Sequence, residues 1–156
     1  MRTLLAASLT ALALSLVGMP PAQAGTSTVQ REIDTALATF PGGTQTSANT
    51  IEWEDGDVTL TLATEGVGSQ SVGSCETGKY CVYSKAQLLG SKLSFSTCNK
   101  TYSTAALSGG VNSMANARSS GTVKGLNSSS TTLVTVNAGG HVNLTPTGIT
   151  QVKCTS

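Results

Sequence analysis

The sequence predicts a mainly β fold, preceded by a short helix and a β-hairpin. After residue 74, apolar residues do not recur at helical spacing. That part instead contains short runs in which apolar and polar residues alternate, separated by turns rich in Gly, Asn and Ser. Alternation with a period of two is typical of half-buried strands, and many short strands favour a sandwich or a barrel.

The N-terminus has the layout of a secretory signal peptide. Arg2 supplies positive charge, residues 4–17 form an apolar run, and Ala22-Gln23-Ala24 is a small-x-small cleavage site. The run is shorter than the roughly 20 apolar residues needed to span a membrane. We therefore expect residues 1–24 to be removed on export. The mature chain is expected to be secreted, extracellular and without a transmembrane segment.

Residues 25–74 are predicted to form an acidic leader that begins with a helix. Between Thr28 and Phe40, apolar residues recur at steps of three and four, and Ser27 or Thr28 can cap the first turn. Pro41-Gly42-Gly43 ends the pattern.

The rest of the leader is predicted as a connector, a hairpin and a linker. Residues 44–49 are polar and are interpreted as a connector. Two alternating runs, 51–54 and 58–62, surround Asp55-Gly56, which predicts a β-hairpin. Residues 63–74 are rich in Gly and Ser without any period, as in a linker.

Residues 75–156 are predicted to form a basic β domain. A loop is expected over 85–91, with Gly90 near its end, and 101–110 is predicted to be irregular. Strands are expected in seven stretches: 80–83, 92–98, 111–117, 123–126, 133–136, 141–144 and 149–154.

Four cysteines lie in the predicted mature chain: Cys75, Cys81, Cys98 and Cys154. In an oxidising compartment an even count predicts two disulfides, and four cysteines allow three pairings, among which the sequence does not choose. A tetrahedral zinc site is not expected, because His141 is the single histidine and there is no Cys-x-x-Cys pair.

Charge is divided unevenly along the chain. All eight acidic residues precede Thr77, and seven basic residues follow it. Three explanations stay open: the acidic segment docks on the basic domain, the lysines are scattered solubilising charges, or the basic domain binds an anionic partner such as a cell-wall polymer.

Two segments carry a resemblance to a known family. Residues 75–83, CETGKYCVY, are followed by 89–98, LGSKLSFSTC, and later by Ser113-Met114-Ala115-Asn116. This pattern resembles the actinobacterial peptidase-inhibitor family with a βγ-crystallin-like fold, of the secreted metalloproteinase-inhibitor type. The resemblance implies a Greek-key sandwich over 75–156, made of a first unit over 75–120 and a shortened second unit over 121–156.

The same resemblance implies a function. It predicts a secreted inhibitor of extracellular peptidases, with a thermolysin-type enzyme as partner, acting through a rigid loop held by a disulfide. The loops considered are 75–81, the tip at Leu88 and Leu89, and the neighbourhood of Cys154. Val82, Leu88 and Leu89 are the candidate inhibitory contacts, and no cofactor is implied.

Catalytic and calcium-binding roles are not expected of the second part. It contains one histidine and no carboxylate after Glu76, so a Ser-His-Asp set or a calcium site would lack acidic members. The alternative to an inhibitor is a non-enzymatic, secreted module that binds cell-wall or other anionic polymer, with an antimicrobial role. Salt would weaken such binding, because counterion release dominates contacts of this kind.

Overall fold

The structure is a computed structural model that describes residues 27–64 and 75–156. The predicted signal peptide and residues 65–74 of the predicted linker lie outside this range. In the described ranges one α-helix precedes eleven strands, and every strand pairing is antiparallel, so the mainly β prediction is confirmed. None of the helices described could cross a membrane.

Helix α1 spans Thr28–Thr39, close to its predicted bounds. The hydroxyl of Ser27 accepts a hydrogen bond from the Gln30 backbone N–H at 3.1 Å, which satisfies one of the free donors of the first turn. Ile33 and Ala36 form the buried face of the helix, which packs against the leader strands.

The leader strands form a three-stranded antiparallel meander, made of β1 (Thr44–Ser47), β2 (Thr50–Trp53) and β3 (Val58–Thr61). The β2–β3 hairpin is as predicted. The connector prediction for residues 44–49 is wrong, because β1 pairs with the edge of β2. Its side chains are largely exposed, so it shows no apolar alternation, and its backbone pairing alone makes it a strand.

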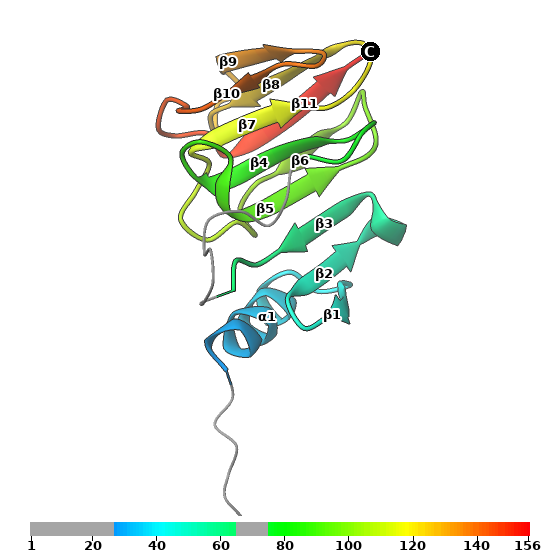
Figure 1. Cartoon of the computed structure of the whole chain (residues 1–156), viewed down its shortest axis with the longest axis vertical. Helices are drawn as coiled ribbons and strands as arrows, with labels where there is room; N and C mark the ends of the chain where they lie inside the picture. The colour runs from blue at the N-terminus through cyan, green and yellow to red at the C-terminus, as the bar shows by residue number, and fades with distance from the viewer. Residues whose placement is uncertain (1–26, 65–74) are drawn as a thin grey trace, which may run out of the picture.

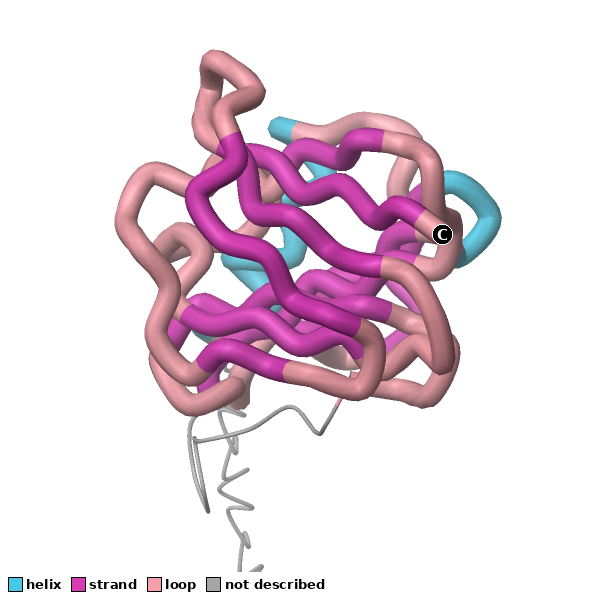
Figure 2. The backbone as a smooth tube through the Cα atoms, turned by 90° about the horizontal axis from the view of Figure 1, so that it is seen from above, coloured by secondary structure: helices cyan, strands magenta, loops and turns pink. Residues whose placement is uncertain are grey.

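The leader continues directly into the sheet of the second part. β3 pairs with β5, with Leu60 opposite Leu93 and Val58 opposite Phe95. The result is a seven-stranded sheet in the order β1-β2-β3-β5-β4-β7-β10. A second sheet of four strands has the order β6-β11-β8-β9, and the strands lie in two layers (Figures 1 and 2).

Residues 75–156 contain the same strand arrangement twice. In the first unit, β4 and β5 form a hairpin, β7 pairs on the other side of β4, and β6 lies in the second sheet. In the second unit, β8 and β9 form a hairpin, β11 pairs on the other side of β8, and β10 lies in the first sheet. The bounds are β4 Tyr80–Lys85, β5 Leu89–Phe95, β6 Thr101–Ser103, β7 Ser113–Asn116, β8 Thr122–Leu126, β9 Thr132–Asn137, β10 His141–Val142 and β11 Gln151–Thr155.

Two predicted stretches differ from the structure. The loop predicted over 85–91 is a tight turn of residues 86–88, because Gly90 can adopt a φ of +76° and lets β5 begin at Leu89. The stretch predicted to be irregular, 101–110, contains β6, a three-residue strand too short to show a period.

The core lies between the two sheets and under α1. Its aromatic centre is Phe95, whose ring lies 5.2 Å from that of Tyr80 and 5.0 Å from that of Tyr102. Both predicted disulfides are present, and the structure selects their pairing as Cys75–Cys81 and Cys98–Cys154. The second of them ties the loop after β5 to β11 in the other sheet.

Candidate functional site

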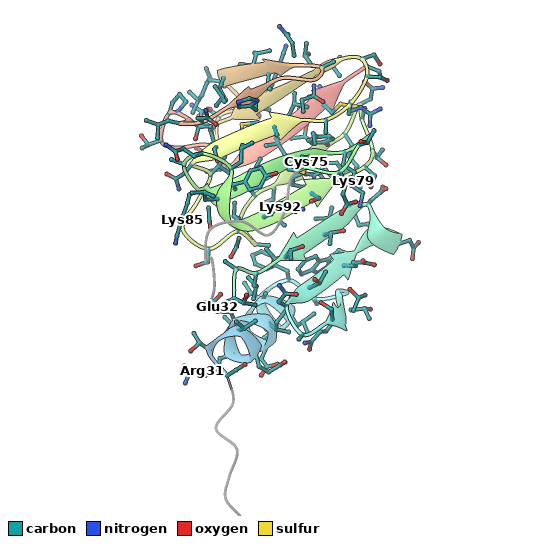
Figure 3. The ribbon with its side chains drawn as sticks, in the orientation of Figure 1. Arg31, Glu32, Cys75, Lys79, Lys85 and Lys92 are labelled. Atoms are coloured by element: carbon teal, nitrogen blue, oxygen red, sulfur yellow. A yellow bond between two sulfur atoms is a disulfide. The ribbon has the colours of Figure 1, made fainter. Side chains whose placement is uncertain are left out.

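Two of the three loops considered in the sequence lie at opposite ends of β4, and the third, around Cys154, lies on β11 in the other sheet. Cys75 and Lys79 are near the start of the strand, whereas Lys85 and the turn that carries Leu88 are at its far end (Figure 3). The structure therefore does not bring the Cys75–Cys81 loop and the Leu88–Leu89 tip into one site. Each has to be assessed on its own surroundings.

Val82 is not available as a contact residue. It faces the core on β4, between Leu93 on β5 and Met114 on β7, and none of its side chain is exposed. The neighbouring residues Cys81 and Tyr83 point to the other face of the sheet, since side chains alternate along a strand. We do not carry Val82 forward as an inhibitory contact.

The Cys75–Cys81 loop is rigid but polar. Beside the disulfide, the Gly78 N–H donates to the Ala117 carbonyl at 2.9 Å, and Glu76 forms an ion pair with Lys79 at 2.7 Å. The hydrogen bond from Lys79, together with its positive charge, holds the pKa of the Glu76 carboxyl below its usual value. The five residues between the cysteines are Glu, Thr, Gly, Lys and Tyr, and the Tyr80 side chain is fully buried in the core. This loop therefore has no exposed apolar side chain to insert into a partner.

The β4–β5 turn, in contrast, holds two successive non-glycine residues in the left-handed region. Gln87 and Leu88 both have φ of +60°. This conformation costs an ordinary residue about 1–2 kcal/mol, because Cβ approaches the carbonyl oxygen. Gly90 follows at +76°, where an added Cβ would lie 2.4 Å from the Ser84 hydroxyl. Strain of this kind persists only where the surrounding structure fixes it.

Side chains of the neighbouring segment brace this turn. The buried Ser113 hydroxyl accepts from the Leu88 N–H at 2.9 Å and donates to the Lys85 carbonyl at 2.6 Å, so one serine spans the turn. Asn112 donates from its side-chain amide to the Ser84 carbonyl at 2.9 Å. Three backbone groups of the hairpin, those of Ser84, Lys85 and Leu88, are thus fixed by hydrogen bonds from outside the hairpin.

A second loop adjoins the turn at the same end of the sheets. The Gln87 N–H donates to the Asn143 carbonyl at 2.7 Å. The next residue, Leu144, is 72 % exposed. We call the surface formed by Lys85, Gln87, Leu88, Leu89 and Leu144 the tip surface. Lys85, Gln87 and Leu144 are exposed in it, and Leu88 and Leu89 are half-buried.

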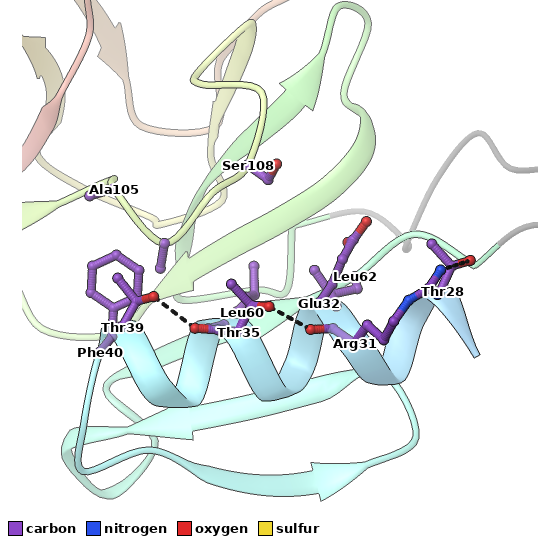
Figure 4. Close-up of a pocket in the computed structure, with 12 residues that line it drawn as sticks. Thr28, Arg31, Glu32, Thr35, Thr39, Phe40, Leu60, Leu62, Ala105 and Ser108 are labelled. Carbon is purple, nitrogen blue, oxygen red and sulfur yellow. Dashed lines mark hydrogen bonds between the residues drawn. The ribbon is translucent and has the colours of Figure 1, made fainter. Parts of the chain in front are cut away.

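A hollow in the described chain lies elsewhere, beside α1. It has a volume of about 430 Å³, and α1, the leader strand β3 and residues 105–108 line it (Figure 4). Its threonine hydroxyls are engaged in the helix, where Thr35 donates to the Arg31 carbonyl at 2.7 Å and Thr39 to the Thr35 carbonyl at 2.8 Å. Small-molecule sites need polar groups that converge on the ligand. This hollow offers few of them.

Several basic residues serve the structure itself. Lys79 is paired with Glu76, and Lys100 with Glu54 of the leader, with its ammonium 4.8 Å from the Tyr102 ring centre. Arg118 donates to two backbone carbonyls of the first unit, those of Gly78 and Ser96. The Lys100–Glu54 pair links the acidic leader to the basic part. The Thr97 hydroxyl adds a second link, because it donates a hydrogen bond to the Asp57 carboxylate of the leader at 2.8 Å.

Three other lysines have different surroundings. Lys92 is buried, and its burial lowers the pKa of its ammonium group. Lys124 on β8 and Lys153 on β11 are direct cross-strand neighbours on the outer face of the second sheet. In residues 27–64 and 75–156, no three His, Cys, Asp or Glu side chains form a group that could hold a metal ion.

Sequence reasoning found part of the tip surface. Leu88 and Leu89 were named from the resemblance, and Ser113 was part of the quoted motif, although its role as the brace of the turn was not foreseen. Leu144 was missed, because residues 141–144 were predicted as a strand. The signal that could have found it is a leucine between Asn143 and Thr145-Pro146, where polar and proline residues end a strand.

In comparisons with protein-family models, curated proteins and solved structures, nothing matches this chain.

Proposed function

We propose that this chain is a secreted, non-catalytic inhibitor of extracellular peptidases that acts through its tip surface. The observation that carries the proposal is the braced β4–β5 turn, in which Gln87 and Leu88 are held in the left-handed region by Ser113 and Asn143. A loop ordered before it meets its partner loses little conformational entropy on binding. A loop of this kind also resists the deformation that peptide-bond cleavage requires.

The proposal includes a fold class and an enzyme class. We assign residues 75–156 to the βγ-crystallin-like Greek-key sandwiches, on the grounds that each unit gives one strand, β6 or β10, to the other unit's sheet. The sequence pattern around Cys75, Cys81 and Cys98 resembles metalloproteinase inhibitors of that fold. A thermolysin-type metallopeptidase is therefore the first enzyme to test.

The test is a titration of the oxidised mature protein against a thermolysin-type metallopeptidase at fixed enzyme concentration. We expect activity to fall linearly to zero near one equivalent, and to change little between low and high salt. A reduced and alkylated sample is the control for folding. Full peptidase activity at micromolar concentrations of the oxidised protein would contradict the proposal.

A second function is favoured by the lysine pair on the outer face of the second sheet. Like charges directly opposite each other destabilise a sheet, so Lys124 and Lys153 would be held together at a cost unless an anion neutralised them. We propose binding of anionic cell-wall polymer as the alternative. Pull-down on such a polymer that disappears with salt, and that Lys124→Gln weakens, would favour it over the inhibitor.

A further inference from the structure

Leu144 differs from the other large apolar residues of the described chain. It is 72 % exposed, whereas the apolar residues of the strands are buried or half-buried. A single exposed leucine is common on protein surfaces and indicates nothing alone. What distinguishes Leu144 is the way the chain on either side of it is held.

The peptide groups on both sides of Leu144 are fixed to the first unit. On one side, the Asn143 carbonyl accepts from the Gln87 N–H at 2.7 Å. On the other side, the Thr145 N–H donates to the Asn112 carbonyl at 2.9 Å, and the buried Thr145 hydroxyl donates to the Val111 carbonyl at 2.8 Å.

Pro146 adds a further restriction. A proline ring disfavours helical backbone in the residue before it, so Thr145 is confined to extended conformations. The segment is therefore stiffened by local chemistry as well as by the three hydrogen bonds. From this segment the Leu144 side chain projects into solvent, 72 % exposed.

Because the backbone is already ordered, burying this side chain in a partner would release nearly the full transfer free energy of a leucine. Interfaces draw most of their affinity from a few such anchors that fill pockets. We propose that Leu144 is the anchor of the tip surface and fills the apolar specificity pocket of the target peptidase, an inference that rests on the proposed function.

The chemistry of the anchor selects the partner class. A pocket that accepts Leu144 must be apolar and of the size of an aliphatic side chain. A pocket with a buried carboxylate would select Lys85 instead, which is the exposed cation of the tip surface. We therefore expect inhibition of peptidases that prefer aliphatic residues and none of trypsin-type enzymes.

The experiment compares inhibition constants of the full mature protein and three variants against a thermolysin-type metallopeptidase, with trypsin in parallel. Leu144→Ala should raise the inhibition constant by about 10- to 100-fold, the range expected from losing most of a buried leucine side chain. Leu144→Met should stay close to the unsubstituted protein. Thr147→Ala, an exposed change in the same loop, is the matched control and should have no effect.

Melting temperatures should be unchanged in all three variants, since the side chains of Leu144 and Thr147 are both exposed. Equal potency of Leu144→Ala and the unsubstituted protein would overturn the anchor while leaving the inhibitor in place. Inhibition of trypsin that depends on Lys85 would overturn it as well. Failure of the unsubstituted protein to inhibit any of these enzymes would overturn the proposed function, and the anchor with it.

Discussion

Tyr83 and Tyr80 are both buried on β4, but only one of their hydroxyls forms a hydrogen bond. The Tyr83 side chain is fully buried on the outer face of the seven-stranded sheet, and its hydroxyl has no hydrogen-bond partner among the described residues. Tyr80, on the opposite face of the same strand, donates from its hydroxyl to the Thr97 carbonyl at 3.0 Å. The two tyrosines therefore form a natural comparison.

Removing the hydroxyl of Tyr83 should stabilise the protein. A buried polar group without a partner costs about 1–3 kcal/mol, so we expect Tyr83→Phe to raise the free energy of unfolding by about 1 kcal/mol. The matched change Tyr80→Phe removes the hydrogen bond to the Thr97 carbonyl and should lower the free energy of unfolding by roughly 0.5–1.5 kcal/mol. Chemical denaturation of both variants measures this, and a destabilised Tyr83→Phe would contradict it.

The same residue predicts an alkaline limit of stability. Burial raises the pKa of Tyr83 to about 12, above its usual value of about 10. The folded state favours the neutral phenol, so the free energy of unfolding keeps its full value below pH 10. Part of it is lost as the pH rises through 12 and the phenol ionises. Burial also raises the pKa of Tyr80.

We expect the melting temperature to fall between pH 10 and pH 12, and to fall less steeply in Tyr83→Phe. Parallel curves for the two proteins would show that Tyr83 does not contribute.

At the scale of elements, the turn between β4 and β5 depends on a residue from β7. Ser113 bonds with the backbone at Lys85 and at Leu88, although it lies 25 residues after Leu88. Local sequence therefore does not determine the conformation of the turn. It is determined by the pairing of β4 with β7, which places the serine beside it.

Replacing this serine should loosen the turn without unfolding the sheet. Ser113→Ala leaves the Leu88 N–H without its acceptor, and we expect a loss of about 1–3 kcal/mol in the free energy of unfolding. Amide hydrogen exchange should speed up at Leu88, and inhibition should weaken if the tip surface is the contact. Ser108→Ala, at an exposed serine, is the control. Unchanged exchange at Leu88 would refute the bracing role.

At the scale of the whole molecule, the leader and the second part share one sheet and one core. Leu60 of the leader and Leu93 of the second part are paired neighbours, and both are fully buried. The link between Lys100 and Glu54 adds a surface contact, of the kind that contributes little. Apolar packing, rather than the charge asymmetry, accounts for most of the attachment.

The two disulfides should differ in their effect on global stability. Cys98–Cys154 joins residues 56 apart, and Cys75–Cys81 joins residues 6 apart. If chain entropy dominates, removal of the first should cost about 4 kcal/mol and of the second about 2 kcal/mol. Denaturation of the paired Cys→Ser variants measures both. A larger loss from the Cys75–Cys81 pair would contradict the entropic account.

The sequence by itself determined the mainly β class, the helix, the β2–β3 hairpin and the existence of two disulfides. These follow from local periodicity, turn chemistry and an even cysteine count, which act within a few residues of one another. Alternation also groups Tyr80 with Val82 on one side of β4 and Leu93 with Phe95 on one side of β5, although it does not show which side of β4 meets the core.

Only the tertiary structure decided the disulfide pairing, the strand β1, the burial of Val82 and the composition of the tip surface. Each depends on segments far apart in the sequence. β1 is a strand because β2 offers it an edge, and Leu144 lies beside Gln87 because β10 pairs with β7 next to β4. The residue pattern of a strand does not identify the strand it pairs with. Local patterns therefore cannot predict which loops meet at the end of the sheets.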